Sequence, residues 1–256
     1  MVVRWEPAQY LKFADHRLRP AIDLLNRIDA DPRTIVDLGA GTGNVTRLLQ
    51  ARWPNARVTG VDSSPEMLAR AADALPQIAW NQADLSAWRP RESVDLLYSN
   101  AALHWVDDHA TLFPALFAMV NPGGTFAVQM PNNFSARSHT AIADVVRSGP
   151  WQSKLEPLLR TPPVQHPSMY FDLLTPAAAS LDIWETEYVH VLEGDRPVLE
   201  WIKGTWLRPL LAALDSEERA QFESRYAEVA AHAYPRRNDD RTLFPFRRLF
   251  IVATRA

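Results

Sequence analysis

The sequence predicts an α/β fold in which strands alternate with helices, from a glycine-rich turn after the first strand and from acidic residues at later strand ends. Residues 34–38 are an apolar run that leads into three alternate glycines, Gly39, Gly41 and Gly43, and a helix-like stretch follows. The chain has nine glycines, so three within five residues are a concentrated signal. Glycine is needed where the backbone turns sharply or a ligand lies against bare main chain. We therefore expect a nucleotide-like cofactor at this turn.

Two common nucleotide motifs fit this turn badly. A phosphate-binding P-loop ends in Gly-Lys-Ser/Thr, whereas Gly43 is followed by Asn44 and Val45. A dinucleotide fingerprint has the spacing G-x-G-x-x-G/A, whereas the spacing here is G-x-G-x-G, with Thr46 and Arg47 where a small residue would help close packing. The next strands are therefore needed to choose the cofactor.

Acidic residues follow the second and third predicted strands. Asp62 ends the strand at 58–62, about 20 residues beyond the glycine turn, where ribose hydroxyls would lie. A carboxylate there can accept two hydrogen bonds from a diol. The alternative is a helix cap, because the Ser-Ser-Pro-Glu sequence that follows Asp62 resembles a helix start with proline at its first position. Asp84 follows the third strand, at 77–80.

Two further strands complete the pattern. Residues 94–100 run into a turn that contains His104 and Trp105, and the Gly123-Gly124 turn leads into a fifth strand. As an ordered set, these elements resemble the class I S-adenosylmethionine (SAM)-dependent methyltransferases over residues 35–130. The resemblance implies a Rossmann-like sheet of about seven strands, the last one antiparallel, with helices on both faces and a helical cap.

The resemblance also implies SAM as the cofactor, with S-adenosylhomocysteine as its product, and a role for each acidic residue. Asp37 would hold the methionyl amine, directly or through water, and Asp62 would bind the ribose diol. Asp84, with Leu85 beside it, would read the adenine amino group. Met67 would pack on the adenine ring, since a thioether suits an aromatic face, and its alternative role is that of a core helix methionine.

In similar methyltransferases an N-terminal arm folds over the cofactor. Here Tyr10 would lie near the sulfonium and Arg17 would meet the methionyl carboxylate, and the alternative is a helix that only packs. The complete predicted cofactor set is Tyr10, Arg17, Asp37, Gly39, Gly41, Gly43, Asp62, Ser63, Met67, Asp84, Leu85 and Asn100.

The second half of the chain is less regular and predicts a cap that is interrupted by strands. A proline-rich segment and two helical stretches surround an alternating run that is typical of a strand. The predicted division is a SAM-binding core with its arm at 1–133, a first cap segment at 134–180, a core strand at 181–195, a second cap segment at 196–238 and a C-terminal core strand at 239–256.

Arginines in the cap and in the last strand indicate the substrate. Arg208 lies on an otherwise apolar helix, and Arg247 and Arg248 lie in an apolar strand, where alternation should turn one of the two inward. Arginines in apolar surroundings need anionic partners, which either internal acids or an anionic substrate can supply. The pattern from Trp5 to Phe250 resembles the trans-aconitate 2-methyltransferase family, which makes a monomethyl ester of a tricarboxylate.

That resemblance implies a set of substrate contacts but no catalytic base. A carboxylate is already ionised at neutral pH, so catalysis would consist of positioning one oxygen in line with the methyl group. No catalytic residue is therefore predicted. The predicted substrate-binding residues are His104, Trp105, Gln129, Tyr170, Arg208, Arg247 and Arg248.

Two other functions remain open at this point. An O-methyltransferase acting on malonyl-acyl carrier protein would also need an arginine for a free carboxylate. A non-catalytic SAM-binding protein is the second alternative, although the three acids Asp37, Asp62 and Asp84 argue against it.

Composition excludes several other classes. The chain has no cysteine, and its seven histidines show no ligand spacing, so no metal is expected. A net charge of −3 without a basic run disfavours nucleic acid. No apolar run approaches the roughly 18 residues of a membrane span, and charged residues interrupt the N-terminus where a signal peptide would be apolar. We expect a cytoplasmic enzyme that acts on a small anionic polycarboxylate and is a monomer or a weak dimer.

Overall fold

The computed structural model describes residues 14–256, and the side chains from Leu18 onward. The described chain falls into two compact units. We call Arg17–Pro131, Pro163–Thr186 and Arg248–Ala256 the sheet unit, and Asn132–Pro162 with Glu187–Arg247 the helical unit.

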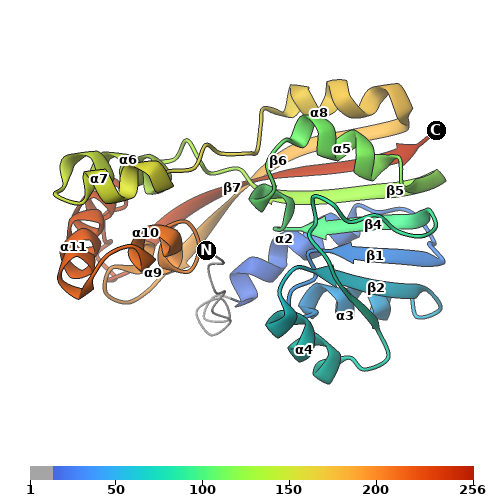
Figure 1. Ribbon diagram of the computed structural model, residues 1–256, viewed down its shortest axis with the longest axis horizontal. Helices are drawn as coiled ribbons and strands as arrows, with labels where there is room; N and C mark the ends of the chain where they lie inside the picture. Colours follow the sequence, from blue (N-terminus) through green and yellow to red (C-terminus); the bar gives the residue numbers. More distant parts are fainter. Residues whose placement is uncertain (1–13) are drawn as a thin grey trace. The chain divides into compact units, whose positions relative to one another are not determined.

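The sheet has seven strands in the order β3-β2-β1-β4-β5-β7-β6 (Figure 1). The pairs β1–β2, β1–β4, β2–β3 and β4–β5 are parallel, whereas β7 is antiparallel to β5. This confirms the predicted α/β class with an antiparallel last strand. The strands are β1 (Thr34–Leu38), β2 (Arg57–Asp62), β3 (Ala79–Gln82), β4 (Val94–Asn100), β5 (Val120–Pro131), β6 (Ala178–Leu192) and β7 (Thr242–Arg255).

Helices cover both faces of the sheet, because side chains that point to opposite faces contact different helices. Tyr98 on β4 donates a hydrogen bond from its hydroxyl to the Ala21 carbonyl of α2, 2.8 Å away. On β5, Ala127 pairs with Tyr98 and shares its face of the sheet, so the neighbouring Phe126 points to the other face. There the Phe126 ring packs against Phe113 of α5. The helices of the sheet unit are α2 (Ala14–Asn26), α3 (Asn44–Arg52), α4 (Pro65–Ala74), the short 3-10 helix η1 (Leu103–Trp105), α5 (His109–Phe117), α8 (Pro167–Leu174) and η3 (Thr175–Ala177).

The helical unit has its own apolar core, in which α6 and α11 pack together. Trp151, Phe222 and Phe244 are buried there. A capping box between Asp215 and Glu218 starts α11. The helices are α6 (Arg137–Ser148), α7 (Gln152–Leu155), η2 (Glu156–Leu158), α9 (Pro197–Lys203), α10 (Arg208–Ala212) and α11 (Ser216–Ala233). Among the helices of residues 14–256, none has the length and apolar character needed to span a bilayer.

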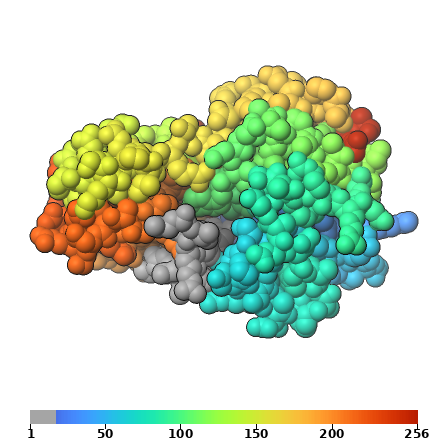
Figure 2. Space-filling model, in the orientation of Figure 1, coloured from blue at the N-terminus to red at the C-terminus, as the bar shows by residue number. Residues whose placement is uncertain are grey.

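The structure differs from the predicted division in three longer segments. Residues 187–195 and 239–247 are predicted as parts of core strands, but they belong to the helical unit, because β6 and β7 are long enough to extend from the sheet unit into it. Residues 163–180 are predicted in the first cap segment, but they belong to the sheet unit, where α8 packs against α5. In Figure 2 the orange-yellow region that contains α8 lies against the green region that contains α5. The reason is aromatic packing, since the Tyr170 and Phe113 rings lie 4.7 Å apart. The apolar stretch 197–214, one of the two helical stretches expected from the sequence, forms two helices, α9 and α10, that are separated at Gly204.

Candidate functional site

The glycine turn after β1 has two structural reasons for its glycines. A Cβ on Gly39 would lie 2.0 Å from the Ala102 Cβ, so only glycine fits at that close approach. Gly41 has a φ of +56°, and among the described residues no atom outside its chain neighbours lies within 4 Å of the position that its Cβ would take. Gly41 therefore exposes left-handed backbone to open space, where a cofactor can lie against the main chain.

Asp62 ties this turn to the end of β2. Its Oδ2 accepts a hydrogen bond from the Gly41 N–H at 2.8 Å, and its Oδ1 accepts one from the Ser64 N–H at 2.9 Å. The helix cap itself is Ser64, whose Oγ accepts from the Met67 N–H at 3.2 Å. Each carboxylate oxygen has a second lone pair, so Asp62 keeps acceptor capacity for a diol.

Asp37 is a buried carboxyl next to the same turn. Its side chain is 1 % exposed, and the Thr46 hydroxyl donates to its Oδ2 at 2.6 Å. Burial raises the pKa of Asp37 to about 7, while the bond from Thr46 opposes this shift and the charge of Asp62 adds to it. A carboxylate in such surroundings is stabilised by a cation, which makes Asp37 the natural partner of an ammonium group.

The remaining predicted cofactor residues in the sheet unit lie at the carboxyl ends of β2, β3 and β4 or on α4. Asp84 is exposed, and its Oδ1 accepts from the Ser86 hydroxyl and N–H at 2.7 and 2.8 Å, two bonds that lower its pKa. Leu85 has its Cδ1 3.4 Å from the position that a Cβ on Gly39 would take. Met67 is buried on α4, and Ser63 is exposed at the end of β2.

Two predicted contacts fall outside the described side chains. Tyr10 lies outside the described residues, and of Arg17 only the backbone, in α2, is described.

The strand register brings three polar residues together on one face of the sheet. Asn100 of β4 lies opposite Gln129 of β5, Gln129 lies opposite Phe250 of β7, and Pro131 lies opposite Arg248. Because every second residue of a strand shares a face, Asn100, Gln129 and Arg248 all point to the face that also carries Tyr98. We call these three residues the polar row.

Two residues of the polar row are buried and Asn100 is half-buried, and part of the row lacks hydrogen-bond partners among the described residues. Gln129 is 0 % exposed and Arg248 is 4 % exposed. Within residues 14–256, neither amide atom of Gln129 has a partner, and neither does the Asn100 Oδ1. A buried polar group without a partner costs about 1–3 kcal/mol. Native proteins retain such groups where a ligand uses them, so the polar row indicates a binding site.

The turn after β4 borders this site. The Ala101 N–H donates to the Gln129 carbonyl at 2.9 Å, and Ala101 has a φ of +52°, which is strained for a residue with a Cβ. The next residues form η1, where the buried His104 ring lies 4.7 Å from the Trp105 ring. The structure thus places both predicted substrate residues of this turn beside the strand end that carries Gln129.

The three predicted arginines are divided between the units. Arg248 belongs to the sheet unit and points inward, as strand alternation predicts for one of the pair. Arg247 belongs to the helical unit, where its Nε donates to the Asn132 carbonyl at 3.2 Å and its terminal nitrogen to the Ser135 Oγ at 3.1 Å. Arg208 starts α10 of the helical unit and is half-buried. Arg248 is therefore the arginine that the structure joins to the polar row.

Tyr170, a predicted substrate contact, has its hydroxyl engaged within the protein. Its side chain is 0 % exposed, its hydroxyl lies 2.6 Å from the His109 Nδ1, and it accepts from the Gln165 N–H at 3.0 Å. Both partners leave the hydroxyl no approach to a substrate. Sequence motifs did not indicate His109 or Thr46, because the spacing of these two residues follows no known pattern.

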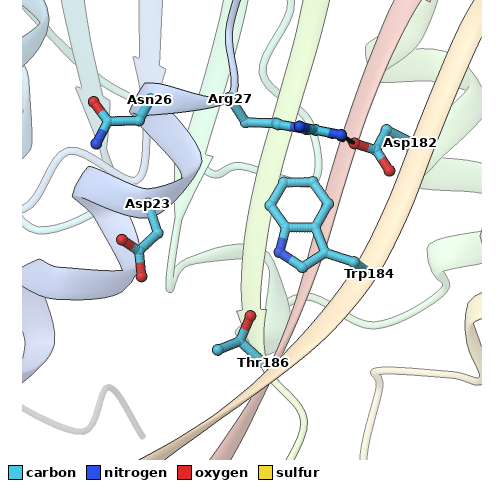
Figure 3. A pocket seen from close by; sticks show the side chains of 6 residues that line it. All are labelled: Asp23, Asn26, Arg27, Asp182, Trp184 and Thr186. Carbon is cyan, nitrogen blue, oxygen red and sulfur yellow. Dashed lines mark hydrogen bonds and ion pairs between the residues drawn. The ribbon is translucent and has the colours of Figure 1, made fainter.

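A pocket of about 450 Å³ lies between α2 and β6 in the sheet unit (Figure 3). Within it Arg27 pairs with Asp182, with nitrogen and oxygen 2.6 Å apart, and its guanidinium lies over the Trp184 ring. Asp23 adds a second carboxyl. With two carboxylates and one guanidinium, the lining of this pocket has a net negative charge, which repels a polycarboxylate. The pocket is therefore a weaker candidate for the substrate site than the polar row.

We expect Gly41→Ala to weaken SAM binding much more than it weakens folding. The added Cβ meets no atom of the described part of the chain within 4 Å, so the stability cost is the strain of a positive φ, about 1 kcal/mol. The same Cβ would occupy the space of the cofactor and should lower SAM affinity by at least about tenfold, or 1.4 kcal/mol. Gly123→Ala is the matched control, because Gly123 also has a positive φ and open space around it. Calorimetric titration and thermal unfolding of both variants check this, and equal SAM affinities would contradict it.

Comparison with known proteins agrees with this geometry. A family model described as "Methyltransferase domain" matches residues 35–124. The trans-aconitate 2-methyltransferase of Azoarcus sp. (strain BH72) is 48 % identical over 252 residues, which cover 98 % of this chain and 99 % of the relative. That of Klebsiella pneumoniae (strain 342) is 46 % identical and covers 97 % of both chains.

A solved structure shows the same fold at low identity. The phosphoethanolamine N-methyltransferase 2 of Haemonchus contortus, in complex with S-adenosyl-L-methionine, superposes with a TM-score of 0.55 at 15 % identity, over 93 % of this chain and 53 % of the other. The likeness in sequence, unlike the likeness in fold, extends along nearly the whole of both chains and includes the segments that supply the polar row. The chain belongs to the trans-aconitate 2-methyltransferase family.

Proposed function

We propose that the protein transfers a methyl group from SAM to one carboxylate of trans-aconitate, or of a closely similar tricarboxylic acid, and so forms a monomethyl ester. The observation that carries this proposal is the identity of 43–48 % to trans-aconitate 2-methyltransferases along nearly the full chain. That likeness favours trans-aconitate over a malonyl thioester, and over a non-catalytic role.

The glycine turn fits the cofactor. When bound, SAM supplies a methyl group on a positively charged sulfur. Gly41 leaves space for the methionyl part, Asp37 accepts from its ammonium, and Asp62 accepts from the ribose diol. Asp84 and Leu85 would flank the adenine. These assignments use the acceptors that the protein leaves available at the carboxyl ends of its parallel strands.

The polar row fits a carboxylate. Arg248 brings a buried positive charge, and the Gln129 amide nitrogen has a proton to donate. A guanidinium grips a carboxylate in a planar fork, which fixes the orientation of the acid as well as its position. Arg208 and Arg247 remain proposed contacts for the other carboxylates of the substrate, and His104 and Trp105 remain proposed contacts at the turn.

The reaction would need no general base. The attacking carboxylate is ionised at neutral pH, so the work of the protein is to present one oxygen and to exclude water. Fixing two reactants in a productive geometry can remove several kcal/mol from a barrier. A neutral amide such as that of Gln129 can orient an anionic oxygen by donating a hydrogen bond to it.

The direct test is to incubate the protein with methyl-labelled SAM and trans-aconitate and to measure an organic-soluble methyl ester. Arg248→Lys keeps the charge but loses the planar fork, so we expect kcat/KM for trans-aconitate to fall at least about tenfold, or 1.4 kcal/mol, with SAM affinity unchanged. Arg255→Lys is the control on the same strand, because Arg255 donates to the Ala118 carbonyl at 2.7 Å. Normal trans-aconitate kinetics in Arg248→Lys would contradict the carboxylate role.

A further inference from the structure

A buried hydrogen-bond chain connects α8, α5 and η1 in the sheet unit. The His109 Nε2 lies 3.0 Å from the Leu103 carbonyl, and its Nδ1 lies 2.6 Å from the Tyr170 hydroxyl. Tyr170 in turn accepts from the Gln165 N–H at 3.0 Å. Tyr170, His109 and Leu103 are 0, 2 and 0 % exposed, so no solvent competes for these bonds.

The geometry determines the direction of each bond. A carbonyl only accepts, so the His109 Nε2 carries a proton and donates it to Leu103. Burial lowers the pKa of His109, although its hydrogen bonds and nearby acids oppose this, so the ring is neutral and its Nδ1 accepts from the Tyr170 hydroxyl. The chain thus runs from the Gln165 N–H through Tyr170 and His109 to the Leu103 carbonyl, with every bond satisfied.

The turn at the end of this chain needs external support. η1 has three residues, its own bonds are those from Trp105 to Ala102 and from Val106 to Leu103, each 3.0 Å long, and 3-10 turns are weak. Ala102 separates it from Ala101, whose positive φ is strained. His104 and Trp105 project from this turn. The positions of the His104 and Trp105 side chains therefore depend on the groups that hold the Leu103 carbonyl in place.

We propose that Tyr170 and His109 are positioning residues that hold η1, and with it His104 and Trp105, in the orientation that methyl transfer to the carboxylate requires. The inference rests on the proposed function for its kinetic consequence, but the restraint on the turn is independent of activity. It adds a hydrogen-bonded link to the aromatic packing of α8 on α5, and it gives the buried Tyr170 a role without substrate contact.

Tyr170→Phe is the main test, because it removes one hydroxyl and keeps the packing of the ring. We expect kcat/KM for trans-aconitate to fall about tenfold, the equivalent of one lost hydrogen bond, while SAM affinity changes by less than about twofold. His109→Leu should have the same effect. His109→Gln should restore most of the activity, because an amide offers a donor and an acceptor. Hydrogen exchange at the Trp105 and Val106 amides of ligand-free protein should accelerate about tenfold in Tyr170→Phe, since local opening becomes easier.

Thr34→Val is the matched control in the same unit. It removes a hydroxyl that accepts from the Asp95 N–H at 2.9 Å, at the start of β1. It should lower the Tm without changing kcat/KM or the exchange of Trp105 and Val106. If Tyr170→Phe behaves like this control, the inference is overturned. If the wild type forms no ester but exchange still accelerates in Tyr170→Phe, the proposed function fails and the restraint on η1 stands.

Discussion

Replacing Asp37 with asparagine should abolish tight SAM binding and at the same time stabilise the ligand-free protein above neutral pH. The carboxylate would face the cofactor ammonium in a buried setting, and removing one partner of such a pair costs about 3–5 kcal/mol. Asparagine is close to aspartate in shape and can still accept from the Thr46 hydroxyl. The loss of SAM affinity would therefore result from the missing charge and not from altered packing.

The effect on stability follows from the raised pKa. The pKa of Asp37 is about 7 in the folded protein, against an ordinary value of 3.8. As the pH rises from about 4 to 7, the unfolded chain loses this proton while the folded one keeps it, so the free energy of unfolding falls. The decrease is on the order of 4 kcal/mol, and it remains above pH 7. The asparagine variant lacks this decrease.

Comparing the two proteins isolates the contribution of Asp37. His139, whose burial lowers its pKa to about 4, stabilises the protein above pH 6.5 and loses that contribution as the pH falls, in both proteins alike. Denaturant titrations at pH 5 and pH 8 give the difference, and calorimetry gives the SAM affinity. Identical pH dependence of the two proteins, with SAM affinity retained, would refute the assignment.

Asp95→Asn is the matched control for this experiment. Although burial raises its pKa, hydrogen bonds from Asn121 and from the Arg33 and Thr34 backbone hold it below the ordinary value. Such a group stabilises the protein above its unfolded pKa, and that stability is lost as the pH falls. The control should therefore lose stability at pH 8, where Asp37→Asn gains it, and it should bind SAM normally.

Gln129→Met should also stabilise the ligand-free protein while it impairs methyl transfer. Both amide atoms of Gln129 are buried without partners among residues 14–256, and methionine has nearly the same shape without their desolvation cost. The gain is expected to be about 1–3 kcal/mol. Loss of the amide should lower kcat/KM for trans-aconitate at least about tenfold, because the substrate then lacks that donor.

Gln50→Met gives the matched comparison for Gln129. The Gln50 amide nitrogen donates to the Trp53 and Pro54 carbonyls at 3.3 and 3.2 Å, so its replacement loses satisfied bonds and should bring no gain in stability. Chemical unfolding and steady-state kinetics of both variants check the prediction. If Gln129→Met is less stable than the wild type, its amide has partners in the ligand-free protein and the polar row is not a ligand site.

The sequence by itself determined the order of elements and the location of the cofactor turn. Apolar runs, the alternate glycines and the serine-proline helix start are local signals, and they were enough for β1, β2 and α4. Asp37 and Asp62 could be placed together from their strand ends, because carboxyl ends of parallel strands meet at one edge of a sheet. The near full-length resemblance in sequence also indicated the family without any knowledge of the geometry.

Only the tertiary structure decided which polar side chains lack partners and which are already engaged. The Gln129 amide lacks a partner among residues 14–256, and the register of β5 and β7 places Arg248 on the same face of the sheet. Arg247, one residue away, instead donates to Asn132 and Ser135. Tyr170 looked like a substrate contact, but His109, 61 residues earlier, takes its hydroxyl. The physical reason is that burial and hydrogen-bond satisfaction depend on groups brought together from distant parts of the chain, which no local pattern records.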